Sequence, residues 1–86
     1  MSIVNELPTY KEYKQMVELN IERGKLDVDQ AVILLSIYRN HLTGRPSHIR
    51  SLMNDANLNW KMANAKLNGL VMKGACKKID KYWYSL

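Results

Sequence analysis

The chain has 86 residues, 47% of them hydrophobic and 24% charged, which supplies one core and leaves too little for two. A single cysteine excludes an internal disulfide framework and a cysteine-rich zinc site. No apolar run approaches the roughly 18 residues of a membrane span. Residues 1–9 contain Asn5, Glu6 and Pro8 where a signal peptide needs an apolar stretch. We therefore expect a single compact domain in the cytoplasm, without membrane contact.

The charge is divided unevenly along the chain. Residues 1–43 hold five Lys or Arg and six Asp or Glu, whereas residues 44–86 hold eight basic residues and two acidic ones. The whole positive excess, a net charge of +5, therefore comes from the second half. This pattern favours a neutral scaffold with a basic face for phosphate. A solvated basic surface that aids solubility explains the charge equally well.

The first element is predicted to be a helix preceded by a short arm over residues 1–8. Thr9 and Glu12 have the spacing of a capping box, which places the helix at residues 10–23. Gly24 can end it in the left-handed conformation. Residues 1–26, the arm and this helix, are also the candidate element for a homodimer.

The second helix is predicted over residues 28–42. Asp27 and Gln30 form another capping box, and the segment is apolar nearly all round. A helix of this kind lies at the centre of a core.

Two shorter amphipathic helices follow. Pro46 fits the first turn of a helix over residues 46–56, which Asn57 can close in the left-handed conformation. Asn59 is the expected N-cap of a helix that runs to residue 73. The buried face of that last helix is predicted from apolar spacing to contain Trp60, Ala63, Leu67, Leu70 and Val71.

The tail changes to a strand pattern. Residues 75–79 and 82–86 are rich in Ile, Tyr and Trp and flank Asp80-Lys81, which predicts a small β-hairpin. The fold class is therefore mostly α with a small β-hairpin.

The link of about three residues between the two short helices is typical of a helix-turn-helix. The stretch from residue 27 to 86 resembles the winged helix-turn-helix domains of bacterial transcriptional regulators, of the MarR-like and ArsR-like types. The resemblance is carried by Ile49-Arg50-Ser51-Leu52-Met53, Asn57-Leu58-Asn59, Ala63, Leu67, Leu70 and Lys73-Gly74. The aromatic strand Lys81-Tyr82-Trp83-Tyr84 is similar to the end of small pilus-operon regulators with a winged helix.

The resemblance implies a small transcriptional regulator that binds double-stranded DNA. The chain departs from the family pattern at Ala65 and Gly69, where a long polar side chain is usual, in its very short wing, and in lacking a long C-terminal dimerisation helix. The expected DNA-binding residues are Arg45, Ser47, Asn59, Lys61, Met62, Asn64, Ala65, Lys66, Asn68, Lys77, Lys78 and Lys81.

These residues are assigned distinct roles. Arg45 and Ser47 would contact phosphate at a helix start, although Ser47 is equally suited to capping that helix. Asparagines pair with adenine and lysines contact guanine or phosphate, with ordinary solvated side chains as the alternative. Met62 can touch a thymine methyl group.

A second apolar stripe, Met62/Ala65/Gly69/Met72, is expected to face outward on the same helix. Exposed methionines are adaptable at protein surfaces. The alternative function is therefore a protein-interaction module with a winged-helix fold, such as a phage or plasmid accessory protein. RNA binding by the basic face is a third option.

The sequence contains no motif for a catalytic or a metal-binding function. The sequence has no nucleophile elbow and no Gly-rich phosphate loop, so we expect neither an enzyme nor a cofactor. His41 and His48 lack a third ligand at metal-binding spacing, so no metal site is expected. Cys76 is expected to be a buried structural thiol, with a redox switch as the less favoured alternative.

Overall fold

The computed structural model describes residues 7–86, so most of the arm expected over residues 1–8 lies outside the described residues. The chain forms four helices and a three-stranded antiparallel sheet in this part. In chain order the elements are α1 (Tyr10–Glu22), α2 (Val28–Leu42), β1 (Ser47–His48), α3 (Ile49–Ala56), α4 (Trp60–Met72), β2 (Cys76–Ile79) and β3 (Tyr82–Ser85). The predicted fold class, mostly helical with a small β-structure, is confirmed at this level.

Local capping explains where the two long helices begin. The Thr9 hydroxyl accepts from the Glu12 N–H at 3.1 Å, and the Glu12 carboxylate accepts from the Thr9 N–H. Asp27 and Gln30 repeat this reciprocal pair at the start of α2. Both predicted capping boxes are therefore confirmed, and each satisfies amide groups that the first helical turn leaves open.

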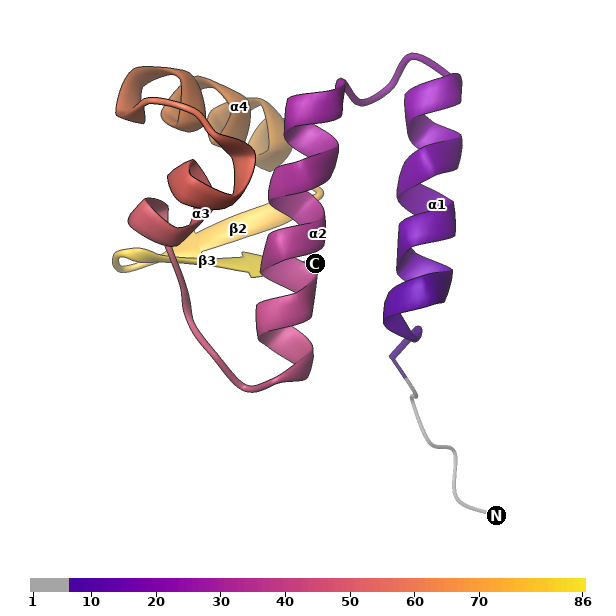
Figure 1. The fold of residues 1–86 in the computed structure, drawn as a ribbon, viewed down its shortest axis with the longest axis horizontal. Helices are drawn as coiled ribbons and strands as arrows, with labels where there is room; N and C mark the ends of the chain where they lie inside the picture. The colour runs from indigo at the N-terminus through magenta and orange to yellow at the C-terminus, as the bar shows by residue number, and fades with distance from the viewer. Residues whose placement is uncertain (1–6) are drawn as a thin grey trace.

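Helix α2 is the centre of the molecule. In Figure 1 it stands between α1 on one side and α3, α4 and the sheet on the other. Its side chains are buried around most of its circumference, with Ile33 at 0% and Ile37 at 1% exposure. This placement confirms the prediction from its all-round apolar sequence, because a helix covered on both sides needs no polar stripe.

The prediction for the start of the third helix is wrong. Pro46 is not in a helix, because Ser47 and His48 form β1 and pair with Trp83 and Tyr82 of β3. The helix begins at Ile49, and His48 caps it by accepting the Arg50 N–H on Nδ1. A favourable residue for a first helical turn was outweighed by strand pairing that only the fold reveals.

The turn into α4 and the final hairpin follow the sequence more closely. Asn57 takes the left-handed conformation with φ 54°, and Asn59 accepts the Met62 N–H at 2.8 Å as the N-cap. The hairpin turns at Asp80, which also has a positive φ of 58°. Strand β3 lies at the middle of the sheet, in the order β1-β3-β2.

Candidate nucleic-acid interface

Helix α4 has one fully buried face and one open face. Ala63, Leu67 and Leu70 are each 0% exposed. The opposite side is exposed and carries Lys61, Met62, Ala65, Asn68 and Met72. Helix α1 packs on the far side of α2 and does not cover this surface (Figure 1).

Two residues expected on the buried face of α4 lie outside the core. Trp60 is 63% exposed and Val71 is 40% exposed. Trp60 occupies the first turn of α4, which extends beyond the core packing and leaves the indole in solvent. The prediction of Trp60 as a core anchor is therefore wrong. The side chain is instead a large exposed aromatic surface adjacent in sequence to Lys61.

The stripe Met62/Ala65/Gly69/Met72, expected to face outward, is interrupted at Gly69. Gly69 is half-buried, and a Cβ at this position would lie 2.8 Å from Nε2 of Gln30 in α2. Gly69 therefore permits close packing of α4 on α2 and does not face outward. The exposed surface of α4 mixes polar and apolar residues.

Two lysines of the basic second half, Lys66 and Lys73, bind groups at the start of α2 and in the loop before it. Lys66 Nζ lies 2.7 Å from Asp27 Oδ2. The hydrogen bond to Asp27 raises the pKa of Lys66. Burial opposes ionisation of Asp27, but hydrogen bonds from Lys66 and the Gln30 N–H, with the charges of Lys66 and Lys73, bring its pKa below the ordinary value. Lys73 donates to the Lys25 carbonyl and to Gln30 Oε1.

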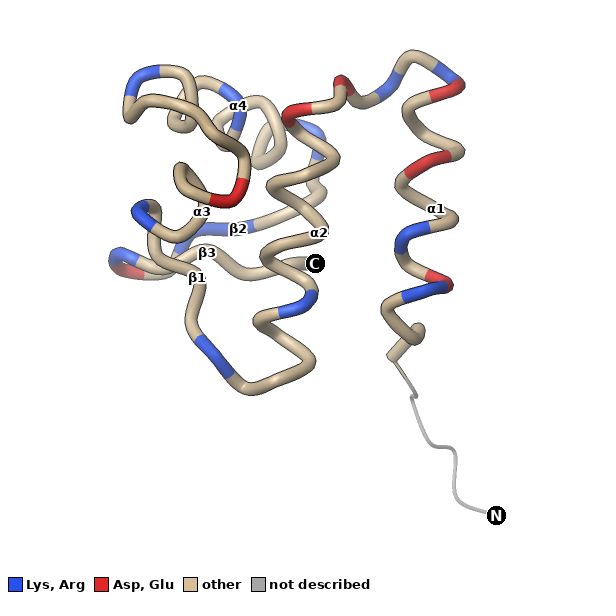
Figure 2. Tube along the Cα trace, in the orientation of Figure 1, with Lys and Arg blue, Asp and Glu red and all other residues tan. Residues whose placement is uncertain are grey.

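Six basic residues of the second half are exposed and use their side chains in neither a salt bridge nor a hydrogen bond among residues 7–86. We call them the six unpaired cations: Arg45, Arg50, Lys61, Lys77, Lys78 and Lys81. In Figure 2 the starts of α3 and α4 and the hairpin tip each carry blue and lie at the end of the molecule away from α1, and the tip also carries the red of Asp80. Of the two acidic residues in this half, Asp55 is paired with Arg39 at 3.4 Å.

Arg50 was missing from the residues expected from sequence. Because α3 begins at Ile49, Arg50 lies in the first turn of the helix. An exposed guanidinium in the first turn of a helix is favourable for phosphate. The sequence already places Arg50 near the start of the third helix, but only Arg45 and Ser47 were expected to contact phosphate there.

Ser47 lies outside any surface that a phosphate can reach. It is 1% exposed, and its hydroxyl accepts a hydrogen bond from Asn40 Nδ2 at 3.1 Å. The expectation that Ser47 contacts a phosphate is corrected by this burial. Arg45, two residues earlier, is exposed.

The three asparagines expected to contact base edges differ in whether their side-chain amide groups are already hydrogen-bonded. Asn59 Oδ1 caps α4, and Asn64 Nδ2 donates to the Trp60 carbonyl at 3.0 Å. Bidentate pairing with adenine needs the acceptor and the donor of one amide together. Asn68 is exposed and has neither group engaged among the described residues, so it alone is ready for such a pair.

The remaining candidate sites have structural roles. Cys76 is 1% exposed, and burial raises the pKa of its thiol to about 11, which keeps it protonated and unreactive at neutral pH. His48 caps α3 and packs edge-on against Tyr82 with ring centroids 6.0 Å apart. Residues 7–86 contain no group of three or more His, Cys, Asp or Glu placed to hold a metal ion.

Comparison with family models, curated proteins and solved structures finds no match for this chain. No helix within residues 7–86 combines the length and the apolar character needed to cross a bilayer. The function must therefore be argued from the chain's own residues.

Proposed function

We propose that this chain is a winged helix-turn-helix domain that binds duplex DNA as a small transcriptional regulator. The observation that carries the proposal is the open face of α4 together with the exposed cations at the start of α3 and at the hairpin tip, on the same end of the molecule (Figure 2). Helix α3, a short link, α4 and a basic hairpin follow one another in the order that the sequence resemblance implies. A cytoplasmic location belongs to the same proposal.

In this mode α4 enters the major groove, which is wide enough for one helix. Lys61 and Asn68 meet base edges, and Ala65 lets the helix backbone approach closely. The other cations, Arg45 and Arg50 before and in α3 and the lysines of the hairpin, neutralise phosphates. Lys78 is held over the Trp83 ring at 5.3 Å, which orders its side chain before binding.

The direct test is binding to a labelled random-sequence duplex, measured by fluorescence anisotropy over a salt series. Each neutralised phosphate contributes about −0.9 to the slope of log K against log salt, so six cations give a slope of about −5. Absence of binding at about 50 mM salt contradicts the proposal.

Lys61 and Lys66 provide a matched pair five residues apart on the same helix. Lys61→Ala removes an unpaired cation and is expected to weaken binding roughly tenfold at about 0.1 M salt. Lys66→Ala removes the same charge from a lysine held by Asp27, so the affinity is expected to stay nearly unchanged. Equal losses for both variants contradict the assignment of the open α4 face to DNA.

A protein partner is the second candidate, because Trp60 is 63% and Met72 is 88% exposed on α4. Exposed aromatic and methionine side chains are frequent in protein interfaces. This candidate replaces the first if no duplex is bound at low salt. It would then require Met62→Asp to abolish the partner contact.

A homodimer through α1 belongs to the same proposal. Leu19 is 42% and Tyr10 is 36% exposed on α1, on the side of α2 away from the six unpaired cations. Leu19→Glu is expected to convert a dimer to a monomer in light scattering. A wild-type chain that is monomeric at high concentration contradicts the homodimer.

A further inference from the structure

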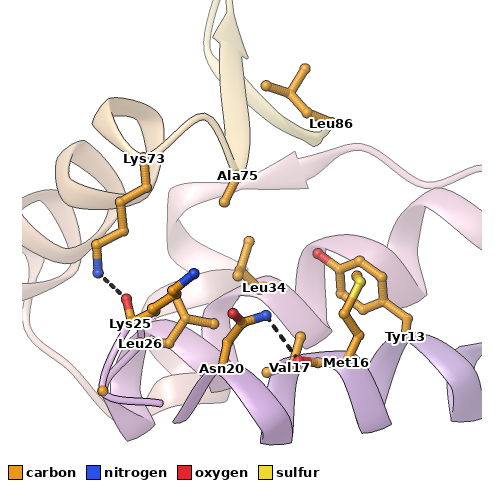
Figure 3. Close-up of a pocket in the computed structure, with 11 residues that line it drawn as sticks. Tyr13, Met16, Val17, Asn20, Lys25, Leu26, Leu34, Lys73, Ala75 and Leu86 are labelled. Atoms are coloured by element: carbon orange, nitrogen blue, oxygen red, sulfur yellow. Dashed lines mark hydrogen bonds between the residues drawn. The ribbon is translucent and has the colours of Figure 1, made fainter.

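A pocket of about 560 Å³ lies where α1, α2 and the C-terminal end of β3 meet. Figure 3 shows Met16, Val17, Leu34 and Leu86 around it, with Leu26 and Ala75 completing walls that are mainly apolar. This volume is within the range of about 300–1,000 Å³ typical of small-molecule sites. The pocket lies on the α1 side of the molecule and includes none of the six unpaired cations.

Tyr13 places a polar group in these apolar walls. The residue is only 6% exposed, and its ring stacks on Tyr38 with centroids 3.9 Å apart and planes 6° from parallel. This stacking fixes the direction of the phenol. In Figure 3 the Tyr13 hydroxyl points from α1 into the pocket, toward Leu34.

The Tyr13 hydroxyl makes no hydrogen bond among residues 7–86, and no fully buried side-chain oxygen or nitrogen there lacks a partner, so this oxygen reaches the open space of the pocket. Its stacking neighbour differs, because the Tyr38 hydroxyl donates to the Pro8 carbonyl. Burial, with smaller contributions from Cys76 and Tyr38, raises the pKa of Tyr13 to about 12. At neutral pH the group is therefore an O–H donor that faces the pocket and has no acceptor among the described residues.

The other polar groups at the pocket are already engaged in part. Asn20 Nδ2 donates to the Met16 carbonyl at 2.9 Å. Lys73 closes one end by donating to the Lys25 carbonyl, as the dashed line in Figure 3 marks. The pocket therefore offers a ligand the directed Tyr13 donor within mainly apolar walls, and the exposed Lys25 lies at its edge.

We propose that this pocket binds a small, mainly apolar organic molecule whose carbonyl oxygen accepts a hydrogen bond from the Tyr13 hydroxyl. Burial of the ligand's apolar body supplies affinity, and the carbonyl fixes its orientation. The site is independent of the proposed DNA interface, so the failure of one leaves the other standing.

Two probes of nearly equal shape test the proposal: 2-acetylnaphthalene, which has a carbonyl group, and 2-ethylnaphthalene, which has none. Each is titrated into the ¹⁵N-labelled 86-residue protein, and amide shifts are followed by NMR. The ketone is expected to bind roughly fivefold more tightly than the hydrocarbon, the effect of one net hydrogen bond. The shifts are expected in α1, in the loop of residues 24–26, around Leu34 and next to Leu86.

Tyr13→Phe keeps the ring and removes the donor, so the two probes are expected to bind this variant equally. Met16→Trp, at a position 49% exposed on the rim, fills the pocket and is expected to block both probes without disturbing the core. Equal affinity of the probes for the wild type overturns the proposal. So does the absence of binding by either probe, or shifts confined to α3, α4 and the hairpin.

Discussion

The two sides of α2 differ in what they present to solvent. On one side, α1 carries acidic and basic residues in similar numbers and leaves an apolar pocket against α2. On the other, α3, α4 and the hairpin carry the whole positive excess of the chain (Figure 2). Because α2 is buried by both sides, it separates a neutral surface from a basic one within a single small core.

The two sides also show that not every basic residue is free to bind a partner. Two of the eight basic residues in the second half, Lys66 and Lys73, turn toward the N-terminal end of α2 and bind its cap and the preceding loop. They help to join α4 to α2 and are not free to meet a polyanion. Net charge counted along the sequence therefore overstates the charge that a partner meets.

The largest expected effect comes from removing equal charge from each side. The triple variant Arg50→Ala, Lys61→Ala, Lys81→Ala is expected to weaken duplex binding by two to three orders of magnitude at about 0.1 M salt, since each contact contributes about 0.9 log units. The matched variant Lys11→Ala, Lys14→Ala, Arg23→Ala lowers the net charge equally on α1. Anisotropy titrations distinguish them, and equal losses indicate that only net charge matters.

The next largest effect is a difference in stability between substitutions on the buried and the exposed face of α4. Leu67→Ala removes a side chain that is 0% exposed, and its cost in the free energy of unfolding is expected to be about 2–5 kcal/mol. Met72→Ala, at 88% exposure on the same helix, is expected to change it by less than about 0.5 kcal/mol. Urea unfolding followed by circular dichroism measures both. A comparable cost at Met72 means that a partner chain covers the outer face.

Much of the fold was predictable because its signals are local. The capping boxes at Thr9 and Asp27, the left-handed Asn57 and the N-cap at Asn59 each depend on residues within one turn of the chain. The all-round apolar sequence of α2 also identified the centre of the core. These features require no knowledge of distant contacts.

The errors came from contacts between distant parts of the chain. Ser47 is buried because β1 pairs with β3, 36 residues further along at Trp83. Lys66 is engaged because Asp27, 39 residues away, lies beside it. Gly69 turns inward because Gln30 packs against it. A helical wheel orders the residues of one helix around its axis, but it does not reveal which neighbouring helix covers each flank.

A smaller effect on DNA affinity tests which base features the open face of α4 contacts. Met62, Ala65 and Met72 offer apolar contact, and only Asn68 has a complete free amide, so thymine methyl groups are the favoured base feature. Replacing every thymine of an A·T-rich duplex by uracil removes those methyl groups and keeps all hydrogen bonds and charges. Affinity is expected to fall about fourfold for each methyl buried. Unchanged affinity contradicts apolar readout by α4, while binding itself is left intact.

The smallest effect concerns the ion pair that joins α4 to α2. Asn is as good an N-cap as Asp, so Asp27→Asn keeps the cap of α2 and removes only the charge facing Lys66. Because the pKa of Asp27 is lowered in the folded state, its charge stabilises the fold at neutral pH, and this contribution is lost as the pH falls through the folded pKa. The wild type is therefore expected to be slightly more stable than the variant at pH 7.

As the pH falls through the folded-state pKa of Asp27, which lies below its ordinary value, the urea midpoints of the two proteins are expected to converge. The variant Lys66→Met serves as control, because it removes the other half of the same pair and should show the same convergence. If the difference between the wild type and Asp27→Asn persists at low pH, the charge of Asp27 is not its cause. The altered cap would then be responsible, and Lys66 would be as free as Lys61 to meet a phosphate.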